Sequence, residues 1–137
     1  MNMFCFQCQE TAKNKGCTVK GVCGKTDEVA NLQDLLVFLT KGISIFNNEA
    51  RKKGLNEAAT DHFIIRSLFS TITNVNFDKD FFIKKVREAL EVRNQIRLEL
   101  KNNGVELNDL HESATWQGFT PDEYLRKAKN IGVLDTD

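Results

Sequence analysis

Apolar residues recur at helical spacing through the first long stretch of the chain, which begins after Thr26 and ends near Lys53. Their return every three or four positions is typical of one face of an α-helix. The face comprises Val29, Leu32, Leu35, Leu36, Leu39, Ile43 and Phe46. Thr26 is suited to cap the first turn, and Gly54 is suited to end the last one. The pattern therefore predicts a long helix over residues 26–53.

Two further helices follow from the same pattern. A second helix is expected from about Glu57 to Ile72, and its inward face should comprise Ile65, Leu68, Phe69 and Ile72. Residues 73–77 should form a break, after which Asp78 can cap a third helix from Lys79 to Asn102. The inward face of this third helix should comprise Phe82, Val86, Ala89, Ile96 and Leu100.

Three long helices joined by short polar connections are typical of an antiparallel, up-down-up bundle. Strand-like alternation is absent from the sequence, so we expect an all-α fold. Arg93 lies on the same stripe as the inward face of the third helix. We expect its aliphatic stem to follow the edge of the core while the guanidinium reaches water, because a buried functional charge is the less common arrangement.

The periodicity stops beyond residue 104, where we expect an ordered connector anchored by Trp116 and Phe119. Thr120, Pro121 and Glu123 then match a capping box with proline at the first helical position, which predicts a short helix through residue 129. The expected organisation is a cysteine-rich loop over residues 1–25, a three-helix bundle over 26–103, and a connector with a short helix over 104–137. This last segment should lead to a missing downstream domain.

Charge and composition exclude several classes of function. Nineteen basic and nineteen acidic side chains cancel, so no overall field would hold the chain on nucleic acid or on an anionic membrane. The first residues lack the basic start and apolar core of a secretory signal, and we see no uninterrupted apolar run of membrane-spanning length. We therefore expect a cytoplasmic protein, in which clustered cysteines are more often metal ligands than disulfides.

All four cysteines fall within residues 5–23 with the spacing C-x2-C-x8-C-x5-C, and they are Cys5, Cys8, Cys17 and Cys23. Four cysteines are the ligands of a cubane iron–sulfur cluster or of a structural zinc. Gly16, Gly21 and Gly24 let the backbone turn tightly, and we expect their amides to point at the sulfurs. Because zinc sites more often pair two C-x2-C knuckles, the spacing favours iron, while zinc, disulfides and free thiols stay open.

Other residues near the cysteines carry weaker signals. Four lysines accompany a single glutamate in residues 1–25, and these lysines are Lys13, Lys15, Lys20 and Lys25. Their charge could offset a negative cluster, but a zinc tetrathiolate has a similar charge and the signal does not decide. Phe4 and Phe6 alternate with the first two cysteines, so we favour a dry lining of the metal centre over a simple core role.

Two histidines and a tryptophan could suggest other sites. His62 has no partner nearby in the sequence, and we expect an exposed surface residue. His111 is followed by Glu112, but neighbours on an irregular segment rarely converge on one point, so a solvated connector is expected instead of a catalytic dyad. For Trp116 we expect packing against the core or a domain interface instead of ligand stacking.

The run from Met3 to Lys25, MFCFQCQETAKNKGCTVKGVCGK, closely resembles the opening of the hybrid cluster proteins, also called prismane proteins or hydroxylamine reductases. Residues 30–44 and 68–78 resemble the first helical bundle of that family in the same order. The resemblance implies that Cys5, Cys8, Cys17 and Cys23 bind a [4Fe-4S] cluster. It also implies that this cluster relays electrons to a buried hybrid iron–sulfur–oxygen cluster.

The resemblance further implies reduction of hydroxylamine to ammonia, with a link to nitric oxide, at ligands in later domains. No cysteine follows Cys23, so the chain by itself should not build the hybrid cluster or turn over hydroxylamine. Its expected partners are downstream domains of the parent chain and a redox protein that donates electrons. The alternative is a zinc-stabilised helical interaction module without a redox role, and a third outcome is a metal-free chain.

Overall fold

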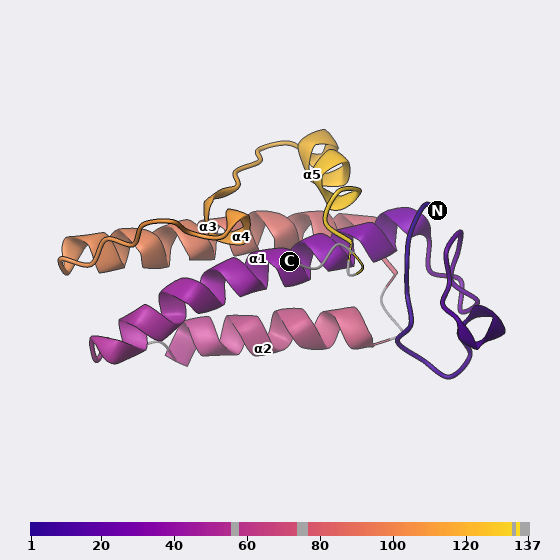
Figure 1. Ribbon diagram of the computed structural model, residues 1–137, viewed down its shortest axis with the longest axis horizontal. Coiled ribbons are helices and arrows are strands. Elements are labelled where there is room, and N and C mark those ends of the chain that lie inside the picture. Colours follow the sequence, from indigo (N-terminus) through magenta and orange to yellow (C-terminus); the bar gives the residue numbers. More distant parts are fainter. Residues whose placement is uncertain (56–57, 74–76, 133, 135–137) are drawn as a thin grey trace.

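Helix α1 (Asp27–Lys52) is the central element of the computed structural model, which describes residues 1–55, 58–73, 77–132 and 134. It packs against α2 (Ala58–Ile72) and α3 (Lys79–Asn102), and the chain direction reverses from each of these helices to the next (Figure 1). The described residues contain no strand, only one isolated β-bridge. The expected all-α, up-down-up arrangement is confirmed.

Local capping explains where α1 and α3 begin and end. Thr26 Oγ1 accepts a hydrogen bond from the Val29 amide at 3.3 Å, and Gly54 has a φ of 73° just beyond the end of α1. The Asp78 carboxylate accepts from the Asp80 amide at 2.9 Å. These ends lie where the sequence predicted them. The predicted start of α2 at Glu57 and most of the predicted break, residues 74–76, lie outside the described residues.

The core lies mainly between α1 and α3, on the faces that the sequence predicted. All seven predicted core residues of α1, from Val29 to Phe46, are at most 1% exposed. On α3, Phe82, Val86 and Ala89 are fully buried, while Ile96 and Leu100 are 5% and 2% exposed. Each of the Val, Leu, Ile and Phe side chains among them contributes about 1.5–3 kcal/mol relative to an exposed one, so these two faces contribute strongly to packing.

The prediction for the inward face of α2 is wrong. Its members are exposed, at 65% for Ile65, 41% for Leu68, 63% for Phe69 and 61% for Ile72. The buried residues of α2 are Phe63, Ser67 and Thr71. At about 100° per residue these lie roughly opposite the apolar stripe. The small side chains of Ser67 and Thr71 let α2 lie close to α1, and the apolar stripe faces outward.

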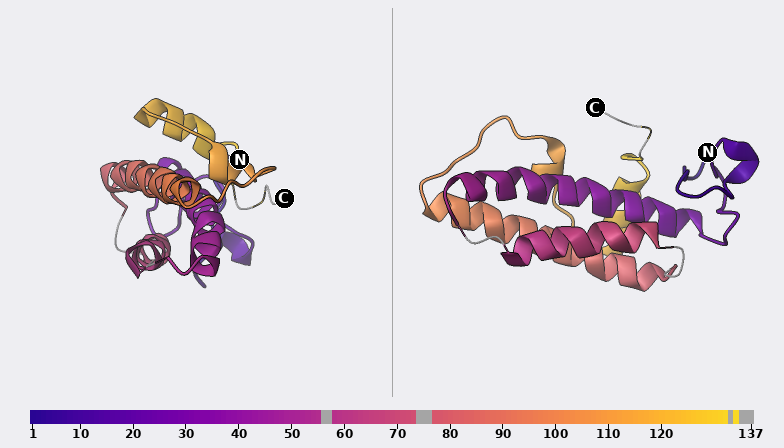
Figure 2. Two further views of the ribbon diagram at one scale, coloured as in Figure 1. Left: turned by 90° about the vertical axis from the view of Figure 1, so that its left-hand side faces the viewer. Right: turned by 90° about the horizontal axis from the view of Figure 1, so that it is seen from below.

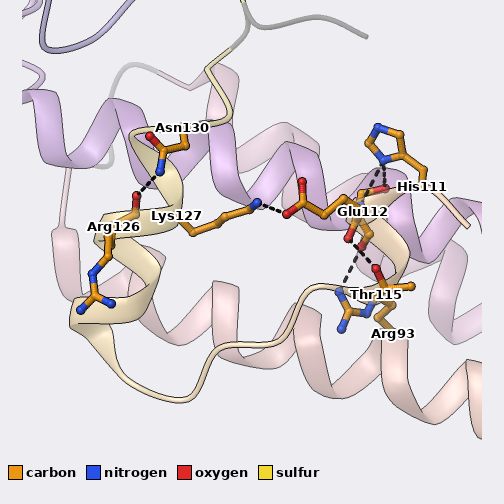
Figure 3. Close-up of polar contacts among 8 residues, drawn as sticks. Arg93, His111, Glu112, Thr115, Arg126, Lys127 and Asn130 are labelled. Atoms are coloured by element: carbon orange, nitrogen blue, oxygen red, sulfur yellow. Dashed lines mark hydrogen bonds and ion pairs between the residues drawn. The ribbon is translucent and has the colours of Figure 1, made fainter.

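Arg93 also departs from the prediction. Its side chain is fully buried and does not reach water. Nη1 donates to the Ser113 carbonyl at 3.0 Å, and Nη2 donates to Asn94 Oδ1 at 3.2 Å. Burial, with a smaller contribution from the positive charge of Arg97, lowers the pKa of Arg93 to about 10. The guanidinium therefore stays charged at neutral pH and holds the connector onto α3 (Figure 3).

The connector contains a short helix that we did not expect, α4 (Glu112–Thr115). It lies against α1 at Gly42, where a Cβ atom would stand 2.0 Å from the Ser113 carbonyl oxygen. Only glycine therefore permits this approach. Trp116 packs on the core near Tyr124, with 6.5 Å between ring centroids, as expected, whereas Phe119 is 76% exposed and is not an anchor.

The predicted short helix is α5 (Pro121–Ala128), which ends one residue earlier than expected. Thr120 Oγ1 accepts from the Glu123 amide at 3.2 Å, and the Glu123 carboxylate accepts from the Phe119 amide at 2.7 Å. Tyr124 and Ala128 are 1% exposed and pack into the main core. An end-on view places α5 on the side of the bundle away from α2 (Figure 2).

By length and composition alone, α1 is apolar enough to cross a membrane, although polar residues interrupt its apolar runs. Its most apolar stretch has a mean hydropathy of 1.3, and 67% of that stretch is buried inside the protein. The apolar character of α1 is therefore accounted for by its place at the centre of the bundle, because α2, α3, α4 and α5 all pack against it.

Candidate metal centre

The four predicted ligands lie in the loop that folds across the end of the bundle where α1 begins (Figure 1). All four are free thiols. Cys17 is buried at 5% exposure, Cys5 and Cys8 are partly buried, and Cys23 is exposed. Met3 and Cys17 pack against Ala30 of α1 in a small core of their own. These contacts join the loop to α1, and they form a cluster that is separate from the main core of the bundle.

Backbone pairing brings Cys5 and Cys17 side by side although they are far apart in the sequence. The Cys5 amide donates to the Cys17 carbonyl at 3.0 Å, and the Cys17 amide donates to the Cys5 carbonyl at 2.9 Å. Gly16 makes the required reversal with a φ of 119°, and a Cβ atom there would lie 2.4 Å from the Phe4 ring. The glycine that the sequence marked as a tight turn thus sits where a larger residue would not fit.

The sulfur of Cys17 receives hydrogen bonds that favour a thiolate. The Ala12 amide donates to Cys17 Sγ at 3.5 Å, and Thr11 Oγ1 lies 3.7 Å away. The pKa of Cys17 is lowered, first by the Ala12 amide and then by the Val22 amide, against the opposing effect of burial. A lowered pKa increases the fraction of thiolate, which is the form that binds metal.

The glycine amides do not take the role that we expected for them. The Gly21 amide donates to the Lys25 carbonyl at 2.8 Å, and the Gly24 amide donates to the Gly21 carbonyl at 2.9 Å. The Gly16 amide likewise bonds a carbonyl, that of Ala12. The Ala12 amide donates to Cys17 Sγ instead, and the Val22 amide helps to lower the pKa of Cys17. No sequence signal singled out these two amides, because amide direction depends on the folded path of the loop.

Lys25 differs from the other lysines of the loop. It is 1% exposed, whereas Lys13, Lys15 and Lys20 are exposed. Its Nζ donates to Gln7 Oε1 at 3.1 Å and lies 3.8 Å from Cys5 Sγ. The ring centroid of Phe77 lies 5.9 Å from the same nitrogen. The loop therefore places a buried cation beside one of the predicted ligands.

The four sulfurs are not gathered around the position of a single ion. Within the described residues, which include all four cysteines, no three His, Cys, Asp or Glu side chains form a group that could hold one metal ion. Zinc–sulfur bonds of about 2.3 Å would bring the sulfurs of a zinc site to within about 4 Å of one another. A cubane gives each thiolate its own iron and surrounds a larger core. Soft thiolate donors with amide hydrogen bonds fit such a cluster chemically.

The other candidate residues fall outside this centre. Phe6 is 54% exposed, so the expectation of a dry lining is wrong for it, whereas Phe4 is partly buried against Gly16. His62 is exposed, as expected. His111 is exposed as well and caps α4, with Nδ1 accepting from the Ser113 amide at 3.1 Å.

Glu112 turns away from His111 and pairs with Lys127 of α5 (Figure 3). The two neighbours therefore do not form a dyad, which confirms the expectation of a connector. A cavity of about 340 Å³ lies at the opposite end of the bundle from the cysteine loop, where Phe46, Arg97 and Leu100 contribute to its lining. It shares no lining residue with the loop.

Comparison with known proteins identifies the relatives of this chain. The model of the Prismane/CO dehydrogenase family matches residues 3–133. A hydroxylamine reductase of Thermoanaerobacter pseudethanolicus is 52% identical over 99% of the chain. Hydroxylamine reductases of Caldanaerobacter subterraneus and Desulfitobacterium hafniense are each 50% identical over 100% of the chain.

The chain spans only 25% of the length of each of these three relatives. The likeness is nevertheless continuous across the cysteine loop, the bundle and α5, since the family model matches residues 3–133. A resemblance first carried by the cysteine-rich opening thus extends over nearly every described element. The chain belongs to the Prismane/CO dehydrogenase family.

Proposed function

We propose that this chain is the N-terminal, electron-relay part of a longer hydroxylamine reductase. In this proposal Cys5, Cys8, Cys17 and Cys23 hold a [4Fe-4S] cluster. The observation that carries the proposal is a set of four free thiols in one loop of a chain about half identical to hydroxylamine reductases. Because no cysteine follows Cys23, reduction of hydroxylamine to ammonia is assigned to the part of the polypeptide beyond this chain.

The residues of the loop have defined tasks in this proposal. When bound, the cluster supplies transfer of single electrons. The backbone pair of Cys5 and Cys17 holds two ligands in fixed positions, and the amide of Ala12 stabilises negative charge on Cys17 Sγ at 3.5 Å. The apolar contacts of Met3 and Ala30 exclude water from one side of Cys17. The chain thus provides ligands, hydrogen bonds and partial burial, which are the means by which a protein tunes such a centre.

Anaerobic reconstitution of the chain tests the proposal directly. We expect about four irons and four sulfides per chain, with a broad absorption in the visible range. Replacing the buried ligand, Cys17→Ser, should lower the iron content strongly, whereas Thr18→Ser at the exposed neighbouring position should leave it unchanged. Stoichiometric zinc without iron would contradict the proposal and support the zinc-stabilised interaction module.

Further domains of the parent chain are the proposed partner of the outward face of α2. Ile65, Phe69 and Ile72 are each more than 60% exposed, and Leu68 adds to the same stripe. Contiguous exposed apolar side chains mark interaction surfaces. The hydroxylamine reductases compared above are about four times as long as this chain. We therefore propose that the remaining part of such a polypeptide covers this face of α2.

Hydrogen exchange tests this docking. The amides of α2 should exchange more slowly in the longer polypeptide than in the 137-residue chain, while those at the capped start of α3 should not change. Phe69→Ser should abolish the difference, because Phe69 is 63% exposed on that face. Equal exchange of α2 in both polypeptides would contradict docking there. Concentration-dependent dimerisation through this face would assign it to a second copy instead.

The electron donor and the cellular compartment are further parts of the proposal. Lys13, Lys15 and Lys20 are exposed around the loop, and their charge would steer an acidic redox protein toward it. Reduction of the loaded chain by such a donor should therefore slow as the salt concentration rises. A cytoplasmic location is proposed with it, because free thiolate ligands persist in a reducing compartment.

A further inference from the structure

Lys25 is a buried cation without a carboxylate partner. Its side chain is 1% exposed, and among the residues that the structure describes it forms no ion pair with Asp or Glu. Its Nζ faces an amide oxygen, Gln7 Oε1 at 3.1 Å, and a sulfur, Cys5 Sγ at 3.8 Å. The ring of Phe77 covers it at 5.9 Å from the centroid. The ammonium group is therefore buried without a carboxylate to balance its charge.

Burying an unpaired charge is costly, and buried ammonium groups are normally paired with an anion. Cys5 Sγ, 3.8 Å from Nζ, is the sulfur that this ammonium contacts. Gln7 orients the ammonium by accepting one of its hydrogens, but an amide carries no net charge. A negatively charged metal centre held by Cys5 would supply the counter-charge that this pocket lacks.

The backbone holds Lys25 in this position. The Gly21 amide donates to the Lys25 carbonyl at 2.8 Å, which closes the turn that carries Cys23. A Cβ atom at Gly21 would lie 3.0 Å from Lys25 Cβ and 3.2 Å from Cys23 Sγ. The lysine stem and the last ligand are thus packed against one glycine. Any cluster held by Cys5 and Cys23 would have this ammonium beside it.

We propose that Lys25 is a positioning residue that places a fixed positive charge beside Cys5 Sγ and raises the reduction potential of the metal centre. This inference rests on the proposed function. When an external one-electron donor reduces the centre, the centre gains one negative charge and no bond of the chain is broken. The fixed ammonium stabilises the more negative, reduced state more than the oxidised state. Removing its charge should therefore make reduction harder.

Three variants test the proposal in anaerobically reconstituted protein. Lys25→Met removes the charge and keeps an unbranched stem, Lys25→Arg keeps the charge, and Lys20→Met removes an exposed lysine of the same loop. Redox titration of the visible absorption should give Lys25→Met a reduction equilibrium constant at least tenfold lower, equal to a potential lower by about 59 mV for a one-electron couple. The other two variants should stay close to the wild-type potential.

Iron release to a chelator provides a second readout. Lys25→Met should lose iron faster than wild type, and Lys25→Arg should retain it. If wild-type chain binds no iron, the proposed function fails and this inference fails with it. If Lys25→Met binds iron at the wild-type potential, or shifts no more than Lys20→Met, the inference alone is overturned. Loss of iron from Lys25→Met and Lys25→Arg alike would assign Lys25 a packing role and would also overturn it.

Discussion

At Cys17, burial and hydrogen bonding act on the same sulfur in opposite directions. Burial disfavours the thiolate, while the amides of Ala12 and Val22 favour it, and the net effect is a lowered pKa. Reactivity also requires access, and Cys17 is only 5% exposed. Cys23, six residues later, is exposed. The two thiols should therefore behave very differently toward reagents in solution.

We predict that iodoacetamide modifies Cys23 first and Cys17 last in the metal-free chain. Access limits Cys17 more than its lowered pKa helps it, because the alkylating reagent must reach the sulfur. Peptide mass spectrometry over a time course measures the order. Reconstitution with iron and sulfide should then protect all four cysteines. Faster modification of Cys17 than of Cys23 would show that the loop opens readily.

A second prediction concerns Gly16, which has a φ of 119° and lies against the Phe4 ring. Gly16→Ala should disrupt the pairing of Cys5 with Cys17, because a Cβ atom would meet the ring at 2.4 Å. Iron retention on reconstitution is the measurement. Gly24→Ala is the matched control, since φ there is 99° but no atom lies within 4 Å of the added Cβ.

The control should show only backbone strain of about 1–2 kcal/mol and should retain most of its iron. If Gly24→Ala and Gly16→Ala lost iron to the same extent, backbone conformation alone would explain both glycines. The contact with Phe4 would then have no separate role.

At the scale of single elements, the prediction of α2 as a helix is correct, but the prediction of its buried face is wrong. The spacing of Ile65, Phe69 and Ile72 correctly predicts a helix, but the buried residues of this helix are Phe63, Ser67 and Thr71. Periodicity reports that apolar residues share a face. It does not report whether that face turns toward the bundle or toward another part of a longer chain.

We predict opposite outcomes for two phenylalanines of this helix. Phe63→Ala should lower the free energy of unfolding by about 3 kcal/mol, because Phe63 is 8% exposed and packs in the main core. Phe69→Ala should change it by less than about 1 kcal/mol, since Phe69 is 63% exposed. Urea denaturation followed by circular dichroism measures both. Similar losses for the two variants would mean that the outward face is covered in solution.

Gly42 offers a test of the contact between α1 and α4. Gly42→Ala should destabilise the protein by about 1–3 kcal/mol, because the added Cβ would stand 2.0 Å from the Ser113 carbonyl oxygen. Better helix propensity would by itself favour alanine by about 1 kcal/mol, so the sign of the change is diagnostic. Thermal unfolding measures it. A stabilised variant would show that α4 moves away from α1 at little cost.

On the scale of the whole molecule, the cysteine loop and the bundle are separate packing units. The buried residues of the loop form their own small cluster with Ala30, while α1 and α3 share larger clusters. Little of the bundle's apolar burial therefore depends on the loop, and residues 1–25 have few core contacts of their own.

Removal of iron should consequently loosen residues 1–25 and leave the bundle folded. Chelation should increase proteolysis of the loop while most of the far-ultraviolet circular dichroism of the helices persists. Exposed arginines of α3, such as Arg87, serve as an internal control for protease access, because the metal should not affect them. Loss of the whole helical signal on chelation would contradict the independence of the two units.

Local patterns were enough to predict α1, α3 and α5 with their caps, whereas the assignment of the four cysteines as one set of ligands stays a prediction. Helices and their caps depend on residues within one or two turns of each other, so they can be read along the chain. The tertiary structure decided which face of α2 turns inward, that α4 covers Arg93, and that Lys25 alone among four lysines is buried beside Cys5. These outcomes depend on contacts between segments that are far apart in the sequence. Such contacts decide which side chains are buried and which charges are paired.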